Sequence, residues 1–495
     1  MLLKNPLSGA SPRRRPFLTL VVAGLALALA SGCDDDSDGD GDHSDLGKLQ
    51  QVLDTNADIA YAAYSDSVTT AKALQTAIAA LIADPTEANL SAAKDAWLVA
   101  REPYGQTEVY RFRASPIDDT NYDLSDGEDG PEGDINAWPL GEALIDYVVT
   151  GNDFGADQLS VTAHSTPLTG DIPPNNLIAA TDITIDAALL ANTVTAEDER
   201  DVLTGYHAIE FLLWGQDLNA DGTADTAGVR DQGQDTGGHR PATDYAQDAT
   251  CTSGPTANGD AELCTRRATY LQLVTDKLVA DLESVRDGWA PGASYRTAFT
   301  DVTTIGQANR KLLEILTGMG TLSEGELAGE RMQIALSADS QEDEHSCFSD
   351  NTHRDILLNA LGVLNTYRGV YAGYDSDLDG EVDVTTNAVN GYGIDSYLSD
   401  VGFGTLASEV QAALDATATQ YDAIDAAARA GKPVDVLIMN AMSDDAAPMR
   451  QCIKALNAQS FKIAQIAIDL GVGTADDVVD PGASECDTTD PTSEC

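Results

Sequence analysis

The spacing of apolar residues is the feature that most constrains the fold of this chain. Beyond an acidic stretch that ends near residue 45, apolar side chains recur every three or four positions in segments rich in Ala and Leu, such as YLQLVTDKLVADLESVRDGW. This spacing is typical of amphipathic α-helices, whereas strand-like alternation is scarce and no short repeat of fixed period occurs. We therefore predict an all-α fold made of two helical-bundle domains of the four-helix-bundle type.

The predicted helices fall into two groups, on either side of two closely spaced cysteines near the middle of the chain. A chain of 495 residues is expected to form more than one domain. The predicted organisation is, in chain order, a lipoprotein signal peptide (1–32), an acidic tether (33–47), an N-terminal helical bundle (48–250), a disulfide loop or linker (251–264), a C-terminal helical bundle (265–475) and a disulfide-containing tail (476–495).

The N-terminal segment has the composition of an export signal. Basic residues precede the apolar stretch PFLTLVVAGLALALA, which is too short for a comfortable transmembrane span. The stretch ends in ASGC, which resembles a lipoprotein processing site, so we expect Cys33 to be lipidated and to anchor the chain to a membrane. Ordinary cleavage nearby is the alternative, and RRPFL also resembles a twin-arginine signal. We expect a location in the bacterial cell envelope, facing the periplasm or the cell surface.

The chain is strongly acidic, with a formal net charge of −53. Such a surface repels nucleic acid and anionic lipid, and it attracts cations. We therefore expect no nucleic acid among the partners.

Six cysteines besides Cys33 form an even set, which is typical of disulfides formed after export. This argues against the twin-arginine route, in which proteins fold before export. Six cysteines allow 15 pairings, so the spacing does not decide among them. The simplest pairing joins two close pairs and leaves a third, namely Cys251–Cys264, Cys486–Cys495 and Cys347–Cys452.

Two loops combine alternating oxygen-bearing side chains with a glycine at the sixth position, a pattern that wraps Ca²⁺. The candidate ligands are Asp217, Asn219, Asp221 and Asp225 in the first loop and Asp375, Asp377, Asp379 and Asp383 in the second. Both loops lack the glutamate that a calcium loop carries at its end, and ordinary turns capped by Asp or Asn give similar strings. Both interpretations stay open, and calcium would be a structural accessory rather than the function.

The segment LTGYHAIEFLLWGQD, residues 203–217, has the pattern of a helix buried on nearly all sides. Its ionisable groups in mid-course, His207 and Glu210, lie one turn apart on the same face. A buried carboxylate needs a metal, an arginine or a proton to meet it. Bundle interiors often build metal sites from Glu and His at this spacing, and a core pair satisfied by a neighbouring Arg or Tyr is the alternative.

A second polar cluster, SQEDEHSCFSDNTHRDI, holds two of the six histidines of the chain. Its acid and imidazole groups would suit a cleft opposite the His207–Glu210 pair, and a solvated acidic loop held by a disulfide at Cys347 is the alternative. The polar residues of this cluster are Asp343, Glu344, His345, Asn351, His353 and Asp355.

Five blocks of the sequence resemble those of imelysin-like proteins, a family that includes the insulin-cleaving membrane protease and the iron-regulated protein A type. The block GYHAIEFLLWGQD carries the family's G-x-H-x-x-E signature. The other blocks follow in the same order as in the family, and they are AWLVAREPYGQTEVYRF, GPEGDINAWPLGEALIDYV, GGHRPATDY and EDEHSCFSDNTHRDI. The resemblance extends from about residue 46 to about residue 471, nearly the whole chain without its signal peptide.

The resemblance implies two all-helical bundle domains with a site near their interface, and a link to iron acquisition in the bacterial periplasm or on the cell surface. Carried over by position, the metal ligands would be His207, Glu210, Glu108, Asp343, Glu344 and His345. The other candidate site residues are Arg111, Tyr206, Asn351 and His353.

We therefore expect a lipoprotein that binds iron, an iron chelate or another divalent transition metal and takes part in iron uptake, with an envelope iron or haem transport component as partner. A metallopeptidase is one alternative, but the sequence lacks H-E-x-x-H, and the inverted motif would need a histidine where Phe211 stands. The other alternative is an envelope interaction protein in which the His207–Glu210 pair is purely structural.

Overall fold

The computed structural model describes most of the chain beyond its acidic N-terminal stretch. The described residues are 45–122, 129–148, 176–191, 202–219, 230, 233, 236–252, 261–479, 484, 486–493 and 495. The predictions for Cys33, Asp221 and Asp225 lie outside these residues. Among the described helices we find none with the length and hydropathy needed to cross a membrane.

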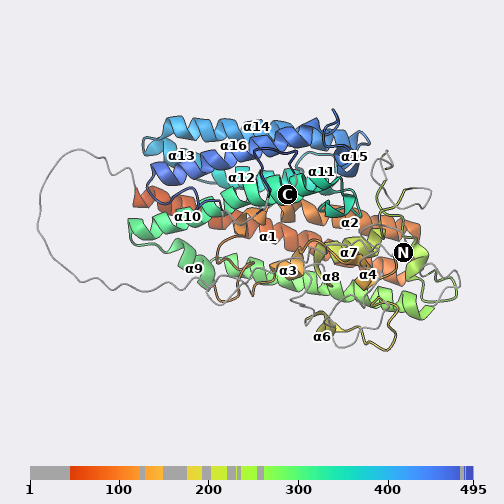
Figure 1. Cartoon of the computed structure of the whole chain (residues 1–495). Helices are drawn as coiled ribbons and strands as arrows, with labels where there is room; N and C mark the ends of the chain where they lie inside the picture. Colours follow the sequence, from red (N-terminus) through yellow and green to blue (C-terminus); the bar gives the residue numbers. More distant parts are fainter. Residues whose placement is uncertain are drawn as a thin grey trace, which may run out of the picture. The chain divides into compact units, whose positions relative to one another are not determined.

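Helices make up nearly all of the regular structure, so the prediction of an all-α fold is confirmed (Figure 1). The α-helices are α1 (Leu46–Ala83), α2 (Glu87–Gly105), α3 (Glu132–Ile135), α4 (Glu142–Ile145), α6 (Ala187–Leu190), α7 (Gly205–Trp214), α8 (Ala261–Trp289), α9 (Ser294–Thr300), α10 (Ile305–Thr321), α11 (Ile334–Ala338), α12 (Thr352–Arg368), α13 (Ile394–Asp400), α14 (Gly404–Arg429), α15 (Val434–Ile438) and α16 (Ala447–Asp469). The other elements are the 3₁₀-helices η1 (Glu108–Tyr110), η4 (Ala242–Tyr245) and η6 (Gln341–Asp343), the π-helix η5 (Leu322–Gln333), and the antiparallel strands β1 (Val370–Tyr371) and β2 (Val389–Asn390).

Two sets of long helices form the fold. In the first set α1 packs against α2 and α8, and α8 also contacts α7. In the second set α14 packs against α16 and α12, and Figure 1 shows α14 and α16 side by side. The two sets are joined by α10, which contacts both α1 and α16, and by the contact of α2 with α12. The helix that begins inside the predicted linker, α8, packs with N-terminal helices, and the predicted domain boundary at 251–264 stays a prediction.

The segment around His207 forms α7, and all ten of its residues are buried. Two aromatic side chains tie neighbouring helices to it. The indole Nε1 of Trp97 on α2 donates to the carbonyl of Tyr206 at 2.9 Å, and the hydroxyl of Tyr270 on α8 donates to the carbonyl of Leu203 at 2.6 Å. The predicted central helix is therefore confirmed, and it is positioned by hydrogen bonds as well as by apolar packing.

Two of the three predicted disulfides are present, and these are Cys251–Cys264 and Cys486–Cys495. The third prediction is wrong, because no bond joins Cys347 to Cys452. Cys452 carries a free thiol that is buried on α16 beside the hydroxyl of Tyr421. Burial raises the pKa of this thiol, which keeps it in the unreactive protonated form.

Candidate functional site

The centre of the predicted site is a pair of histidines from distant parts of the chain. His207 lies on α7, and His345 lies in the loop between η6 and α12. Their ring centroids are 4.6 Å apart and their planes meet at 80°. The ring of Trp138 lies beside both, at 4.9 Å from His207 and 6.2 Å from His345. The structure therefore brings the two predicted polar clusters together.

Each of these histidines is hydrogen bonded to a carboxyl group through Nδ1. Nδ1 of His207 is 2.8 Å from Oε2 of Glu210, and Nδ1 of His345 is 2.8 Å from Oδ2 of Asp355. A carboxylate on one ring nitrogen orients an imidazole so that the other nitrogen can bind a metal. Nε2 of His207 is buried and has no hydrogen-bond partner among the described residues. Glu210, which we predicted to be a ligand, is thus better placed to orient His207.

Burial determines the protonation of the His207–Glu210 pair. Loss of solvation lowers the pKa of His207 and raises the pKa of Glu210, in each case far from the usual value. These shifts favour the neutral form of both groups. Oε1 of Glu210 also accepts hydrogen bonds from the main-chain amide and the hydroxyl of Ser349, at 2.9 and 2.7 Å. The carboxyl group is therefore held in one orientation.

A buried arginine holds the carboxylate behind His345. Nε and Nη2 of Arg101 donate to Oδ1 of Asp355 at 3.1 and 2.9 Å. Burial alone would raise the pKa of Asp355, but Arg101, together with His345 and His207, outweighs burial and keeps this pKa well below its usual value. Burial lowers the pKa of His345 to about 4, so its ring is neutral at neutral pH, as metal binding requires.

A cavity of about 510 Å³ opens beside His345 and Trp138. The π-helix η5 forms part of its wall, and π-helical turns are frequent at functional sites. The charged residues that line it are Arg111, Arg331, Glu132, Glu326, Glu330 and Asp343. Because the carboxylates outnumber the guanidinium groups, the cavity favours cations.

The match of the sequence to a known family decides its classification. Residues 60–462 match the imelysin family. The chain belongs to the imelysin family. Its fold is similar to that of a protein described as an iron-regulated protein A precursor from Parabacteroides distasonis, with a TM-score of 0.53 and 17% identity over 87% of this chain and 95% of the other. An imelysin-like protein from Psychrobacter arcticum is similar at a TM-score of 0.50 and 15% identity, over 86% of this chain and 97% of the other. No curated protein matches the sequence.

Not all of the predicted ligands of this imelysin meet at the histidine pair. Glu108 lies instead at the centre of an ion-pair cluster, where its Oε2 is 3.2 Å from Nη1 of Arg111 and 3.2 Å from Nη2 of Arg331. Burial alone would raise the pKa of Glu108, but the two arginines, together with Arg101 and His345, outweigh burial and lower it to about 2. A carboxylate engaged by two guanidinium groups is a poor ligand for a cation. Asp343, in contrast, lines the same cavity as His345.

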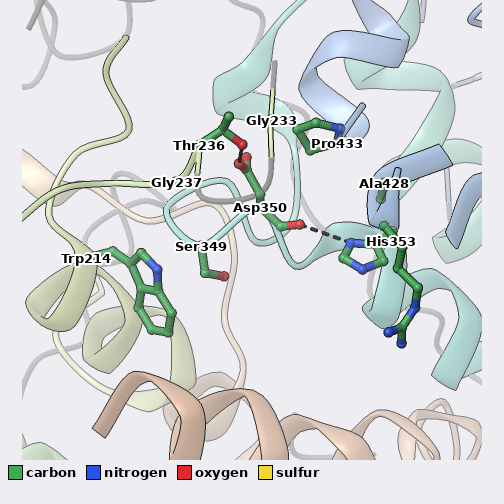
Figure 2. A pocket seen from close by; sticks show the side chains of 10 residues that line it. Trp214, Gly233, Thr236, Gly237, Ser349, Asp350, His353, Ala428 and Pro433 are labelled. Carbon is green, nitrogen blue, oxygen red and sulfur yellow. Dashed lines mark hydrogen bonds between the residues drawn. The ribbon is translucent and has the colours of Figure 1, made fainter. Parts of the chain in front are cut away.

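Three further predicted residues lie outside the histidine pair. Tyr206 packs against Arg101, whose guanidinium carbon is 5.0 Å from the ring centroid. Asn351 is the residue that precedes α12. His353 lines a second cavity, of about 370 Å³, where its Nδ1 is 3.0 Å from the main-chain oxygen of Asp350 (Figure 2).

The second calcium-like loop brings three of its four predicted ligands together. Carboxylate oxygens within 4.8 Å of one another come from Asp375, Asp377 and Asp379. The loop already uses one of them internally, because Oδ2 of Asp375 accepts the main-chain amide of Gly380 at 2.7 Å. Asp383 instead accepts hydrogen bonds from Ser376. An Asp-capped turn accounts for this loop, and calcium there stays a prediction.

The glycine of the G-x-H-x-x-E signature has a structural reason. Gly205 begins α7 with a φ of +90°, a backbone conformation that favours glycine. A Cβ added at this position would lie 2.6 Å from the carbonyl oxygen of Ile135. The glycine therefore sets how closely α7, and with it His207, approaches α3.

Gly205→Ala should lower the free energy of unfolding by about 2–4 kcal/mol, because it combines left-handed backbone strain with overpacking. Denaturant unfolding followed by circular dichroism measures this loss. Gly306→Ala, at the start of α10, is the matched control because an added Cβ meets no atom within 4 Å there. The control should change stability by at most about 1 kcal/mol. Equal stability of the two variants would contradict the prediction.

Proposed function

We propose that this imelysin binds iron at the His207–His345 pair and takes part in iron uptake at the bacterial cell envelope. The proposal rests on Nε2 of His207, which is buried, has no partner among the described residues and lies beside a second neutral imidazole. An unsatisfied buried polar atom is destabilising by about 1–3 kcal/mol, and a bound metal would satisfy it. Imidazole nitrogen is a common ligand of iron.

The number of protein ligands favours reversible binding over a permanent cofactor. In the described part of the chain, no third His, Cys, Asp or Glu places a ligand atom close enough to His207 and His345 to complete a three-residue cluster. Iron bound there would keep positions for water, for a small chelating molecule or for a carboxylate of the adjoining cavity, such as Asp343. An incomplete coordination shell suits a protein that receives iron and passes it on.

Two observations support a location in the cell envelope. The N-terminal segment has the composition of an export signal, and the Parabacteroides neighbour is described as a precursor of an iron-regulated protein. We propose that lipidation of Cys33 tethers the folded part to a membrane. Its partner would be an envelope component that transports iron or haem.

His207→Gln should lower the affinity for Fe²⁺ by about 100-fold or more, because it removes the buried imidazole nitrogen. Anaerobic equilibrium dialysis of the purified protein measures this affinity. His239→Gln is the matched control, since His239 is exposed and lies outside the site. Circular dichroism should show unchanged helix content in both variants.

Three results would count against this function. Unchanged Fe²⁺ affinity in His207→Gln would remove the histidine pair as the iron site. Unfolding of the variant with or without iron would favour the alternative function, an envelope interaction protein in which the His207–Glu210 pair is purely structural. Zinc-dependent cleavage of a protein substrate, lost in the variant, would favour the metallopeptidase, although such enzymes use three protein ligands and a general base.

A further inference from the structure

The loop between η6 and α12, residues 344–351, contains two serines three positions apart. The hydroxyl of Ser349 donates to Oε1 of Glu210 at 2.7 Å, and its main-chain amide donates to the same oxygen at 2.9 Å. The other oxygen of this carboxyl group, Oε2, is 2.8 Å from Nδ1 of His207. Ser349 thus fixes the carboxyl group at one oxygen, while the imidazole is held at the other.

The second serine has the same relation to the other histidine of the pair. The hydroxyl of Ser346 donates to Oδ2 of Asp355, which is the oxygen that lies 2.8 Å from Nδ1 of His345. Arg101 donates to the opposite oxygen of this carboxylate, Oδ1. The carboxylate therefore cannot rotate away from His345 without breaking hydrogen bonds at both of its oxygens.

The loop that carries the two serines is anchored in its middle and at its junction with α12. The ring of Phe348 packs against the rings of Phe211 and Trp138, with centroids 5.1 and 5.8 Å apart. The main-chain amide of Ser346 donates to the hydroxyl of Thr352 at 2.9 Å. Because the backbone of the loop is held in this way, each serine hydroxyl is a precise support for the carboxyl group that it contacts.

We propose that Ser346 and Ser349 are positioning residues that set the iron affinity of the histidine pair, an inference that rests on the proposed iron binding. Each serine acts through a carboxyl group and is not itself a ligand. A carboxyl group at Nδ1 fixes the orientation of an imidazole that binds a metal through Nε2. Loss of a group that supports metal ligands from outside typically lowers metal affinity by about 10–100-fold.

The surroundings of the two serines differ, and this difference allows the hydroxyl group to be tested by itself. Ser349 is partly exposed and lines the cavity of about 370 Å³ (Figure 2). Ser346, in contrast, is 0% exposed. Threonine at position 349 keeps the hydroxyl, and the cavity offers room for its additional methyl group. The same methyl group at position 346 would overpack the interior.

Anaerobic equilibrium dialysis with Fe²⁺ tests the proposal. Ser349→Ala and Ser346→Ala should each lower the affinity by about tenfold or more. The double variant should lose about the product of the two factors, because the serines act on different histidines. Ser349→Thr should bind Fe²⁺ as tightly as the wild type. Ser67→Ala is the control, since its buried hydroxyl donates to the main-chain oxygen of Ala63 at 2.8 Å within α1, and it should leave the affinity unchanged.

Denaturant unfolding of the metal-free proteins separates positioning from a purely structural role. Ser349→Ala and Ser67→Ala should lower the midpoint of unfolding to a similar extent, because each removes one hydroxyl hydrogen bond, but only Ser349→Ala should lose iron affinity. Wild-type affinity in both Ser349→Ala and Ser346→Ala, or a loss that Ser349→Thr does not restore, would overturn the proposal. The iron site itself would then still stand if His207→Gln lowers the affinity in the same assay. Unchanged affinity in His207→Gln would contradict both the iron site and the positioning role.

Discussion

Arg101→Met should lower the free energy of unfolding of this imelysin by about 3–5 kcal/mol, because it leaves Asp355 as an uncompensated buried charge. Both side chains of the pair are 1% exposed. The guanidinium also donates from Nη1 to Oδ1 of Asn136 at 2.5 Å and lies over the ring of Tyr206. Methionine keeps much of the apolar stem but none of the donors. Urea denaturation followed by far-ultraviolet circular dichroism measures the loss.

Two further variants separate charge from packing in this prediction. Arg101→Met/Asp355→Asn should be more stable than Arg101→Met alone, since it removes the stranded charge. Arg286→Met is the surface control, because Arg286 pairs with an exposed aspartate, and it should cost less than about 1 kcal/mol. If Arg101→Met and Arg286→Met had the same effect, the buried pair would not support the fold.

Glu108→Gln should cost about 3 kcal/mol at neutral pH and progressively less in acid. The pKa of Glu108 is about 2 in the folded protein, against an ordinary value of 4.5. A lowered pKa gives stability that is complete above the unfolded value and is lost as the pH falls through the folded value. A shift of this size corresponds to about 3 kcal/mol. The difference between wild type and variant should therefore be full above about pH 4.5 and shrink toward pH 2.

Urea denaturation at a series of pH values from about 7 to about 3 measures this difference. Glu314→Gln is the control, because the partly exposed Glu314 pairs with Lys311 at the surface and should change stability by less than about 1 kcal/mol at every pH. A penalty for Glu108→Gln that is the same at all pH values would show that the shape of the side chain matters, and its charge does not.

Much of the fold could be predicted because helices that bury one face repeat their apolar residues every three or four positions. The central helix α7 was predicted from the same pattern, since all of its faces are apolar. His207 and Glu210 were found because ionisable groups are rare on such a helix. His345 was found because acids and imidazoles are dense around it, although the 4.6 Å contact between the two rings needed the structure.

Other parts of the site could not be predicted from local spacing. The sequence held a signal for Arg101 that was missed. Arg101 is a single basic residue between Trp97 and Tyr104 on the buried face of α2, and a buried basic residue needs a partner. Its partner Asp355 is 254 residues away, and no periodicity reveals such a pairing. Glu108 was predicted to be a metal ligand because the sequence does not reveal its ion pair with Arg331, which is 223 residues away.

The same long separations affect how the chain acquires its structure during synthesis. The helices that carry Arg101 and Glu108 are made first, and Asp355 and Arg331, which pair with them, follow 254 and 223 residues later. At the usual rates of translation this interval is roughly 10–50 s. Throughout it the nascent N-terminal helices hold charged groups that they cannot yet bury. The buried charges of the first half can therefore be paired only once the segment up to α12 has been made.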